Sequence, residues 1–141
     1  MTYVCGGIGV VIGFAHVGIY TLDLDISVDF YSRCLGFRLV WRGIVHHKTG
    51  ELPVATLQLG SFVIEIVRPA AAEKVRYAEG PIQHLALLVE DIEGCITDLE
   101  AKGVGLDEEI DEIGYDGGTR HCFVRGPSNE RIELCERIGV H

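Results

Sequence analysis

The sequence predicts an α+β fold in which two βαβββ repeats form a curled mixed sheet with helices on its outer face. Two histidines, two aspartates and two glutamates recur at a single offset of 68 positions (84 − 16): His16 and His84, Asp23 and Asp91, Glu65 and Glu133. Each half also shows the pattern of a strand, a helix and then further strands. Such self-similarity is typical of a structural unit that is present twice in the chain.

The length of 141 residues suits one domain with a substantial buried core. We expect a single domain over residues 13–137, made of repeats 13–68 and 81–137. Residues 69–80 then form the linker between the repeats, and residues 1–12 form an N-terminal extension.

The composition argues against some classes of binding partner and against export from the cell. The net charge of −9 argues against nucleic acid or an anionic membrane surface as a partner. The apolar N-terminus is interrupted by glycines and lacks a basic start, so it resembles neither a signal peptide nor a membrane span. Five cysteines without a Cys-x-x-Cys spacing are typical of free thiols in a reducing compartment, which predicts a cytoplasmic protein.

The first repeat begins with a strand over residues 14–20, whose alternation places His16 and Tyr20 on one face. Asp23 can cap the helix that follows, and Gly36 ends it. Three more strands are predicted at residues 37–44, 52–59 and 62–67.

The second repeat follows the same plan. A strand over residues 82–89 leads to a helix from Ile92 to about Lys102, and Gly103 ends this helix. The remaining elements are a weak strand at 109–113, a glycine-rich loop at 114–118, and strands at 119–125 and 131–136.

The repeated His and Glu residues predict a metal site. Each repeat places a His on its first strand and a Glu on its last, so two facing repeats would bring two imidazoles and two carboxylates together. This mixed set suits one divalent ion of intermediate hardness, such as Ni, Co, Mn, Fe or Zn. The simpler alternatives are a satisfied core histidine and a solvated carboxylate. Against them, Glu65 lies in an otherwise apolar run, where an unpaired carboxylate is costly.

The chain resembles the vicinal oxygen chelate superfamily and, within it, the glyoxalase I-like proteins, over about residues 13–137. The matching motifs are His16-Val-Gly with Asp23-Leu, Asp29-Phe-Tyr31 through Leu35-Gly-Phe37, Val63-Ile-Glu65, His84 with Asp91-Ile, and Gly126-Pro-Ser-Asn-Glu-Arg-Ile-Glu133. The superfamily also contains epimerases, ring-cleaving dioxygenases, thiol transferases and drug-binding proteins, so the motifs identify the fold more closely than the substrate.

The resemblance implies a lactoylglutathione lyase-like metalloenzyme with ligands at His16, Glu65, His84 and Glu133. Its small-molecule substrate would be the hemithioacetal of a 2-oxoaldehyde and a thiol. Glu133, with Glu65 as its counterpart, would remove the proton next to the carbonyl, and the enediolate would be stabilised at the metal. The family also implies a homodimer whose sites combine the first pair of ligands from one chain with the second pair from its partner.

Two departures from the family pattern leave the identity of the substrate's thiol undecided. Glyoxalase I proteins commonly carry an Arg and an Asn for glutathione at the positions of Tyr20 and Pro69. The arrangement ending in Pro69 is similar to methylmalonyl-CoA epimerase, which is one alternative. A metal-free drug-binding protein is another, whereas a dioxygenase would be crowded by Glu65. The basic residues that could bind an anionic substrate are Arg42, His46, His47, Arg120 and Arg125. Of these, Arg120 is favoured because it follows the glycine-rich loop. Tyr20 is the second residue that we expect to bind substrate.

Overall fold

The computed structural model describes residues 14–47, 50–71, 82, 84–113 and 118–138. The first half of the chain contains β1 (Val17–Tyr20), α1 (Leu24–Asp29), the π-helical turn η1 (Phe30–Cys34), β2 (Arg38–His47), β3 (Gly50–Leu59) and β4 (Phe62–Val67). The second half contains β5 (Leu85–Leu88), α2 (Ile92–Ala101), β6 (Leu106–Ile113), β7 (Thr119–Arg125) and β8 (Arg131–Arg137). The N-terminal extension, most of the predicted linker and most of the glycine-rich loop lie outside the described residues.

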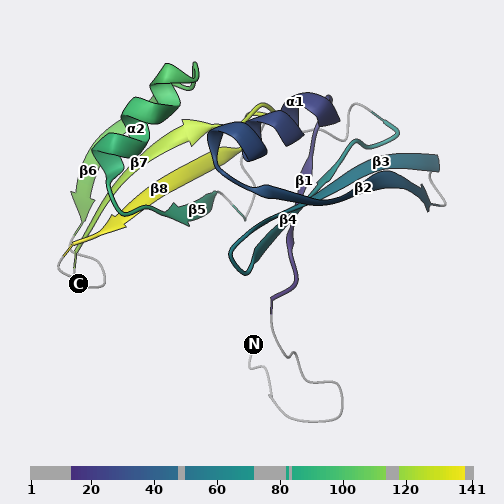
Figure 1. Cartoon of the computed structure of the whole chain (residues 1–141), viewed down its shortest axis with the longest axis horizontal. Coiled ribbons are helices and arrows are strands. Elements are labelled where there is room, and N and C mark those ends of the chain that lie inside the picture. Colours follow the sequence, from purple (N-terminus) through teal and green to yellow (C-terminus); the bar gives the residue numbers. More distant parts are fainter. Residues whose placement is uncertain (1–13, 48–49, 72–81, 83, 114–117, 139–141) are drawn as a thin grey trace, which may run out of the picture.

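Two mixed four-stranded sheets form the body of the molecule (Figure 1). Their strand orders are β1-β4-β3-β2 and β5-β8-β7-β6, and in each the first strand pairs in parallel with the last. The pairing keeps the same offset, since Gly18 lies opposite Glu65 and Ala86 lies opposite Glu133. The predicted α+β fold with mixed sheets is therefore confirmed, with one sheet in each half of the chain.

Both helices begin as predicted. The side chain of Asp23 accepts a hydrogen bond from the Ile26 amide at 3.1 Å, and that of Asp91 accepts one from the Gly94 amide at 3.0 Å. These caps satisfy amide groups that have no partner within the helix. Gly36, with φ of 76°, follows the first helical segment and allows the chain to turn into β2.

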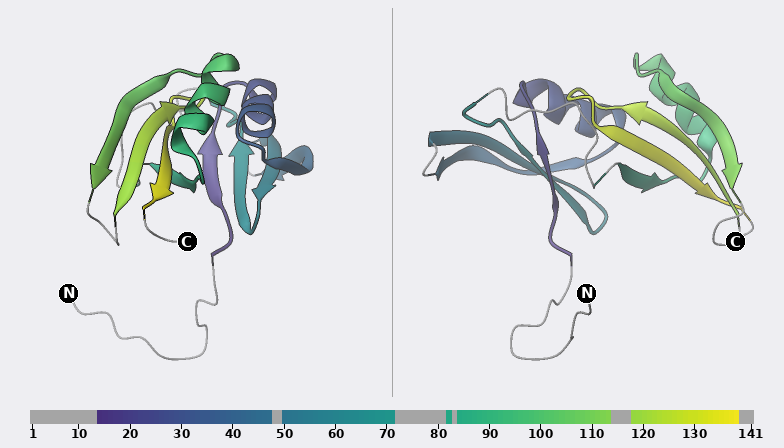
Figure 2. Two further views of the ribbon diagram at one scale, coloured as in Figure 1. Left: turned by 60° about the vertical axis from the view of Figure 1, so that its left-hand side comes forward. Right: turned by 180° about the vertical axis from the view of Figure 1, so that it is seen from behind.

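The helices cover one face of each sheet, and the two sheets diverge beneath them (Figure 2). α1 contacts β3 and β4, whereas α2 contacts β8. Alternation along the strands sends every second side chain towards the helices, among them Leu57, Ile64 and Leu134, which are almost completely buried. We call this the helix-covered face of each sheet, and the opposite side its open face.

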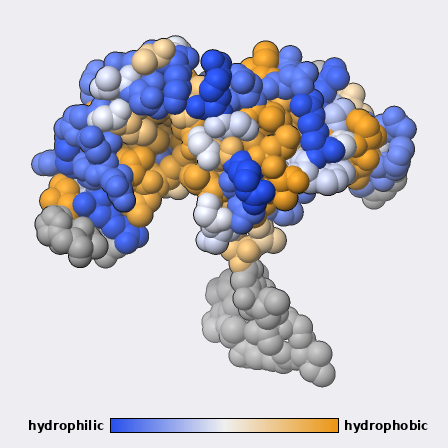
Figure 3. Space-filling view, viewed as in Figure 1, coloured by the Kyte–Doolittle hydropathy of each residue, from blue (hydrophilic) through white to orange (hydrophobic). Residues whose placement is uncertain are grey.

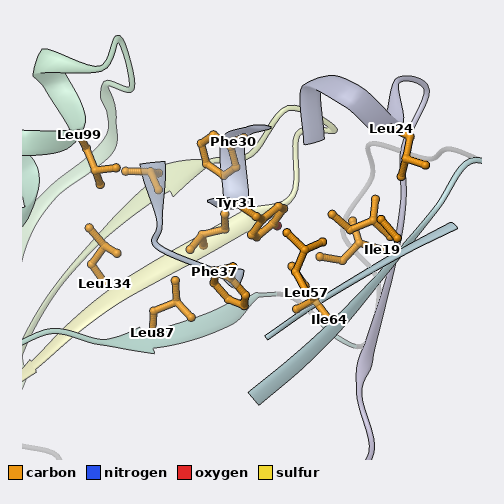
Figure 4. Close-up of a cluster of buried hydrophobic side chains, with 14 of the residues drawn as sticks. Ile19, Leu24, Phe30, Tyr31, Phe37, Leu57, Ile64, Leu87, Leu99 and Leu134 are labelled. Atoms are coloured by element: carbon orange, nitrogen blue, oxygen red, sulfur yellow. The ribbon is translucent and has the colours of Figure 1, made fainter. Parts of the chain in front are cut away.

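One apolar cluster joins the two halves. It combines Phe30, Tyr31 and Phe37 of the first half with Leu87, Leu99 and Leu134 of the second (Figure 4). The hydroxyl of the buried Tyr31 donates a hydrogen bond to Glu130 Oε1 at 2.9 Å. Burial raises the pKa of Glu130, although this hydrogen bond lowers it. The contact ties η1 to the turn before β8.

Several element boundaries differ from the predicted ones. β1 begins at Val17, three residues later than expected, and β6 begins at Leu106, three residues earlier. The β2–β3 hairpin is longer than predicted because pairing continues to His47 opposite Gly50, whose φ of 124° favours glycine. Within the described residues, no helix has the length and apolar character that crossing a bilayer requires.

Candidate metal and substrate site

The first His–Glu pair lies on the open face of the first sheet. His16 comes two residues before Gly18, which is opposite Glu65, so both side chains emerge on the same side of neighbouring strands. The His16 Nε2 and Glu65 Oε2 atoms are 3.8 Å apart. The two side chains are 44% and 38% exposed, so this pair can reach a ligand.

The second pair repeats this arrangement on the second sheet. His84 comes two residues before Ala86, which is opposite Glu133, and the His84 Nε2 and Glu133 Oε2 atoms are 2.9 Å apart. Phe123 pairs with Glu133 across β7 and β8, and its ring meets the His84 ring edge-on with centroids 5.6 Å apart. The Glu133 side chain is only 18% exposed, less than half the exposure of Glu65.

Each pair supplies one imidazole nitrogen and one carboxylate oxygen, which are suitable donors for the divalent ions predicted from the sequence. Among the described residues, no three His, Cys, Asp or Glu side chains converge as a metal-binding group. A single chain therefore presents two half-sets of ligands on two sheets. The donor chemistry fits a divalent metal, and completing the set requires the two half-sets to face each other.

A cavity of about 720 Å³ adjoins the first pair. It is lined by Gly18, Ile19, Tyr20, His47, Leu52, Glu65, Val67, Pro69, Ala70 and Ala71. Its size is typical of a small-molecule site. Tyr20, which is 50% exposed, lines this cavity together with Glu65 and Pro69.

Arg120 lies elsewhere. It pairs with Glu136 across β7 and β8, three positions from Glu133, and therefore emerges on the helix-covered face. There its guanidinium contacts Glu93 of α2 and Glu136, the latter at 3.1 Å, and this hydrogen bonding lowers the pKa of Glu93. The structure does not bring Arg120 to the face that carries His84 and Glu133.

Most other basic candidates have acidic neighbours. Arg42 contacts Asp25, His46 Nδ1 lies 3.3 Å from Glu51, and Arg125 Nε lies 3.0 Å from Asp107. His47 is the candidate that lines the cavity. The described cysteines are free thiols, and burial raises the pKa of Cys122 to about 11 and that of Cys135 above its usual value. The thiols of Cys122 and Cys135 are therefore poor nucleophiles near neutral pH.

Sequence reasoning did not single out Phe123 or Arg131. The Arg131 guanidinium carbon lies 3.6 Å from the centroid of the Phe123 ring, so the two form a cation–π contact beside the second pair. If the strands on either side of the turn at residues 126–130 are paired residue by residue, starting with Arg125 and Arg131, Phe123 falls opposite Glu133. The same pairing would have assigned Arg120 to the other face.

Comparison with known proteins identifies the family. The model of the glyoxalase/bleomycin resistance protein/dioxygenase superfamily matches residues 13–134. The chain belongs to this superfamily. Among solved structures, a glyoxalase family protein from Bacillus cereus has a TM-score of 0.78 at 22% identity, covering 96% of this chain and all of the other. The glyoxalase I of Leishmania major, described as trypanothione-dependent, has a TM-score of 0.68 at 26% identity over 86% of this chain and 84% of its own.

Two sequence relatives differ in how much of their own length this chain covers. The Bacillus subtilis protein YwbC is 32% identical over 126 residues, which cover 86% of this chain and 95% of the relative. A lactoylglutathione lyase from Arabidopsis thaliana is 27% identical over 129 residues, which cover 88% of this chain but only 44% of the relative. The chain thus spans less than half the length of this lyase.

Proposed function

We propose that the protein is a metal-dependent lyase or isomerase of the glyoxalase I type, acting on the hemithioacetal of a 2-oxoaldehyde and a thiol. The observation that carries the proposal is the identical placement of the two His–Glu pairs, each on the open face and in the same register. Similarity to lactoylglutathione lyases and to a glyoxalase I structure supports it.

The four proposed ligands are His16, Glu65, His84 and Glu133, which would hold one divalent ion. When bound, such an ion supplies Lewis-acid polarisation of neighbouring substrate oxygens. Of the two carboxylates, we assign proton abstraction to Glu133, the less exposed of the two and the one whose His partner lies closer. Glu65 faces the cavity and would act as its counterpart.

The two half-sets support a homodimer in which the first pair of one chain faces the second pair of its partner. Large apolar side chains remain exposed near the proposed ligands, including Tyr20 at 50% and Leu88 at 66%. Figure 3 shows apolar residues at the surface over the middle of the molecule. Such surface is typical of a contact between subunits. The free thiols also suit the cytoplasmic location that we predict.

A second candidate is an acyl-CoA epimerase of the same fold. Tyr20 and Pro69 both line the cavity, at the positions where the glyoxalase I pattern has residues for glutathione. Both reactions remove a proton next to a carbonyl, so the same carboxylates would serve either one.

Hydrogen exchange in deuterated buffer distinguishes these candidates. The metal-loaded protein is given the methylglyoxal–glutathione hemithioacetal in one sample and methylmalonyl-CoA in another, with Glu133→Gln as the control. We expect product and deuterium incorporation from the hemithioacetal and loss of both in the variant. Exchange of methylmalonyl-CoA alone would establish the epimerase. A protein that takes up no divalent ion would refute both and favour a metal-free binding protein.

Mixing two inactive variants tests the shared site. One variant carries His16→Ala and Glu65→Gln, and the other carries His84→Ala and Glu133→Gln. If sites combine halves of two chains, a mixed dimer contains one intact site, and random exchange restores about a quarter of the wild-type sites. Sites within single chains would give no restoration, because neither variant retains a complete ligand set.

A further inference from the structure

The single tryptophan of the chain lies on the same open face as Glu65. Thr56 of β3 pairs with Trp41 on one side and with Glu65 on the other, which places the three residues in one row across the sheet. A β-bulge at Val40 produces this placement, since the register shifts between Leu39 and Trp41. Trp41 remains 47% exposed.

Gly43 determines how the indole lies. A Cβ atom added at this position would come within 2.6 Å of Trp41 Cζ2 and 2.9 Å of Cη2. The six-membered ring therefore lies over the backbone of Gly43, two residues further along the same strand, and a larger residue there would force the ring to shift. The ring thus lies against the sheet while much of the side chain stays accessible.

The ring leans towards the row of residues that borders the cavity. Gly43 pairs with Val54, and Val54 pairs with Val67, which lines the cavity together with Tyr20. Trp41 and Glu65 are two strands apart, a separation of about 10 Å between the strands. This distance suits a ligand whose polar end lies at Glu65 and whose other end reaches β2.

We propose that Trp41 is a stacking surface for a planar, aromatic or conjugated group of the ligand, with Gly43 as the residue that positions its ring. The inference rests on the proposed function for the location of the ligand's oxygen atoms and adds a preference for planar substituents. Offset stacking of two flat rings adds affinity beyond the area that they bury, whereas a methyl group cannot stack.

A matched pair of chelating probes tests the preference. Benzohydroxamate and acetohydroxamate have the same two neighbouring oxygen atoms and differ in the phenyl ring that replaces a methyl group. Their binding to the zinc-loaded protein is measured by calorimetry and by the emission of Trp41, which is the single tryptophan. We expect benzohydroxamate to bind more tightly, with stacking contributing about two- to tenfold of the difference, and to change the emission.

Three variants separate stacking from general apolarity. Trp41→Leu should remove the stacking part of the preference, and Gly43→Ala should reduce it while retaining the fluorophore. Ile44→Ala should leave it unchanged, because Ile44 is also half-exposed on β2 but pairs with Pro53 on the opposite face.

If the wild type binds zinc but prefers benzohydroxamate over acetohydroxamate no more than Trp41→Leu does, the stacking role of Trp41 is overturned and the proposed function is unaffected. Emission that responds to dilution of the protein and not to benzohydroxamate would overturn the stacking role too, by placing Trp41 between two copies of the chain. Failure to bind zinc would instead remove the proposed function on which the inference rests.

Discussion

Replacing Tyr31 with phenylalanine removes one hydroxyl group from the contact between the two halves. This hydroxyl donates to Glu130 Oε1 at 2.9 Å, and Glu130 Oε2 accepts a second hydrogen bond from the Ser128 amide at 2.8 Å. Hydrogen bonds to charged groups contribute about 1.5 to 3 kcal/mol. Because the Ser128 contact remains, we expect Tyr31→Phe to lower the free energy of unfolding by about 2 kcal/mol. The midpoint of thermal unfolding should fall by about 6 °C.

The loss should also depend on pH. Burial raises the pKa of Glu130 above its usual value of 4.5, so its contribution to stability is complete below that value and is lost as the pH rises through the raised pKa. The Tyr31 hydrogen bond opposes this loss by stabilising the carboxylate. The effect of Tyr31→Phe should therefore be larger at about pH 8 than at about pH 4.

Denaturant unfolding at both pH values measures these effects. Tyr20→Phe serves as the control, because the half-exposed Tyr20 should change stability by no more than about 0.5 kcal/mol. Glu130→Gln removes the titrating group, and in that background the effect of Tyr31→Phe should no longer vary with pH. The reasoning fails if Tyr31→Phe costs the same at both pH values or no more than the control.

Two further predictions concern local structure, and denaturant unfolding measures both. Asp91→Ala removes the hydrogen bond that the Gly94 amide donates and should lower the free energy of unfolding by about 1 kcal/mol. Asp91→Ser keeps a capping oxygen, so retained stability in this variant would show that the loss comes from the cap. Leu134→Ala opens a cavity beneath α2 and should cost about 3 kcal/mol. Ile26→Ala, at a side chain of α1 that is 57% exposed, should cost no more than about 0.5 kcal/mol, and equal losses at Ile26 and Leu134 would contradict the assigned core.

The signals that predicted the fold correctly are local or periodic. Asp23 and Asp91 cap their helices through neighbouring amides, so their roles follow from short sequence windows. The strand pairing keeps the offset of 68 positions, because Glu65 lies opposite Gly18 and Glu133 lies opposite Ala86. The two His–Glu pairs could therefore be predicted without a structure.

Other features depend on register or on distant contacts. The position of Arg120 after the glycine-rich loop favours it as a substrate-binding residue, but its pairing with Glu136 places it on the helix-covered face. The bulge at Val40 changes which side of β2 Trp41 occupies, and simple alternation does not reveal such a bulge. Tyr31 and Glu130 are 99 positions apart, so their contact follows only from the packing of the two halves.

Every strand pair in the described part of the chain joins two strands of the same half. The first sheet has all of its strands once Val67 has been synthesised, before β5 exists as polypeptide. Each sheet can therefore form as a folding unit during translation, since its strands close only on other strands of the same half. Contacts between the halves, such as the hydrogen bond from Tyr31 to Glu130, can form only after the second half has been synthesised, so until then the apolar residues of the first half that face the second half lack their partners.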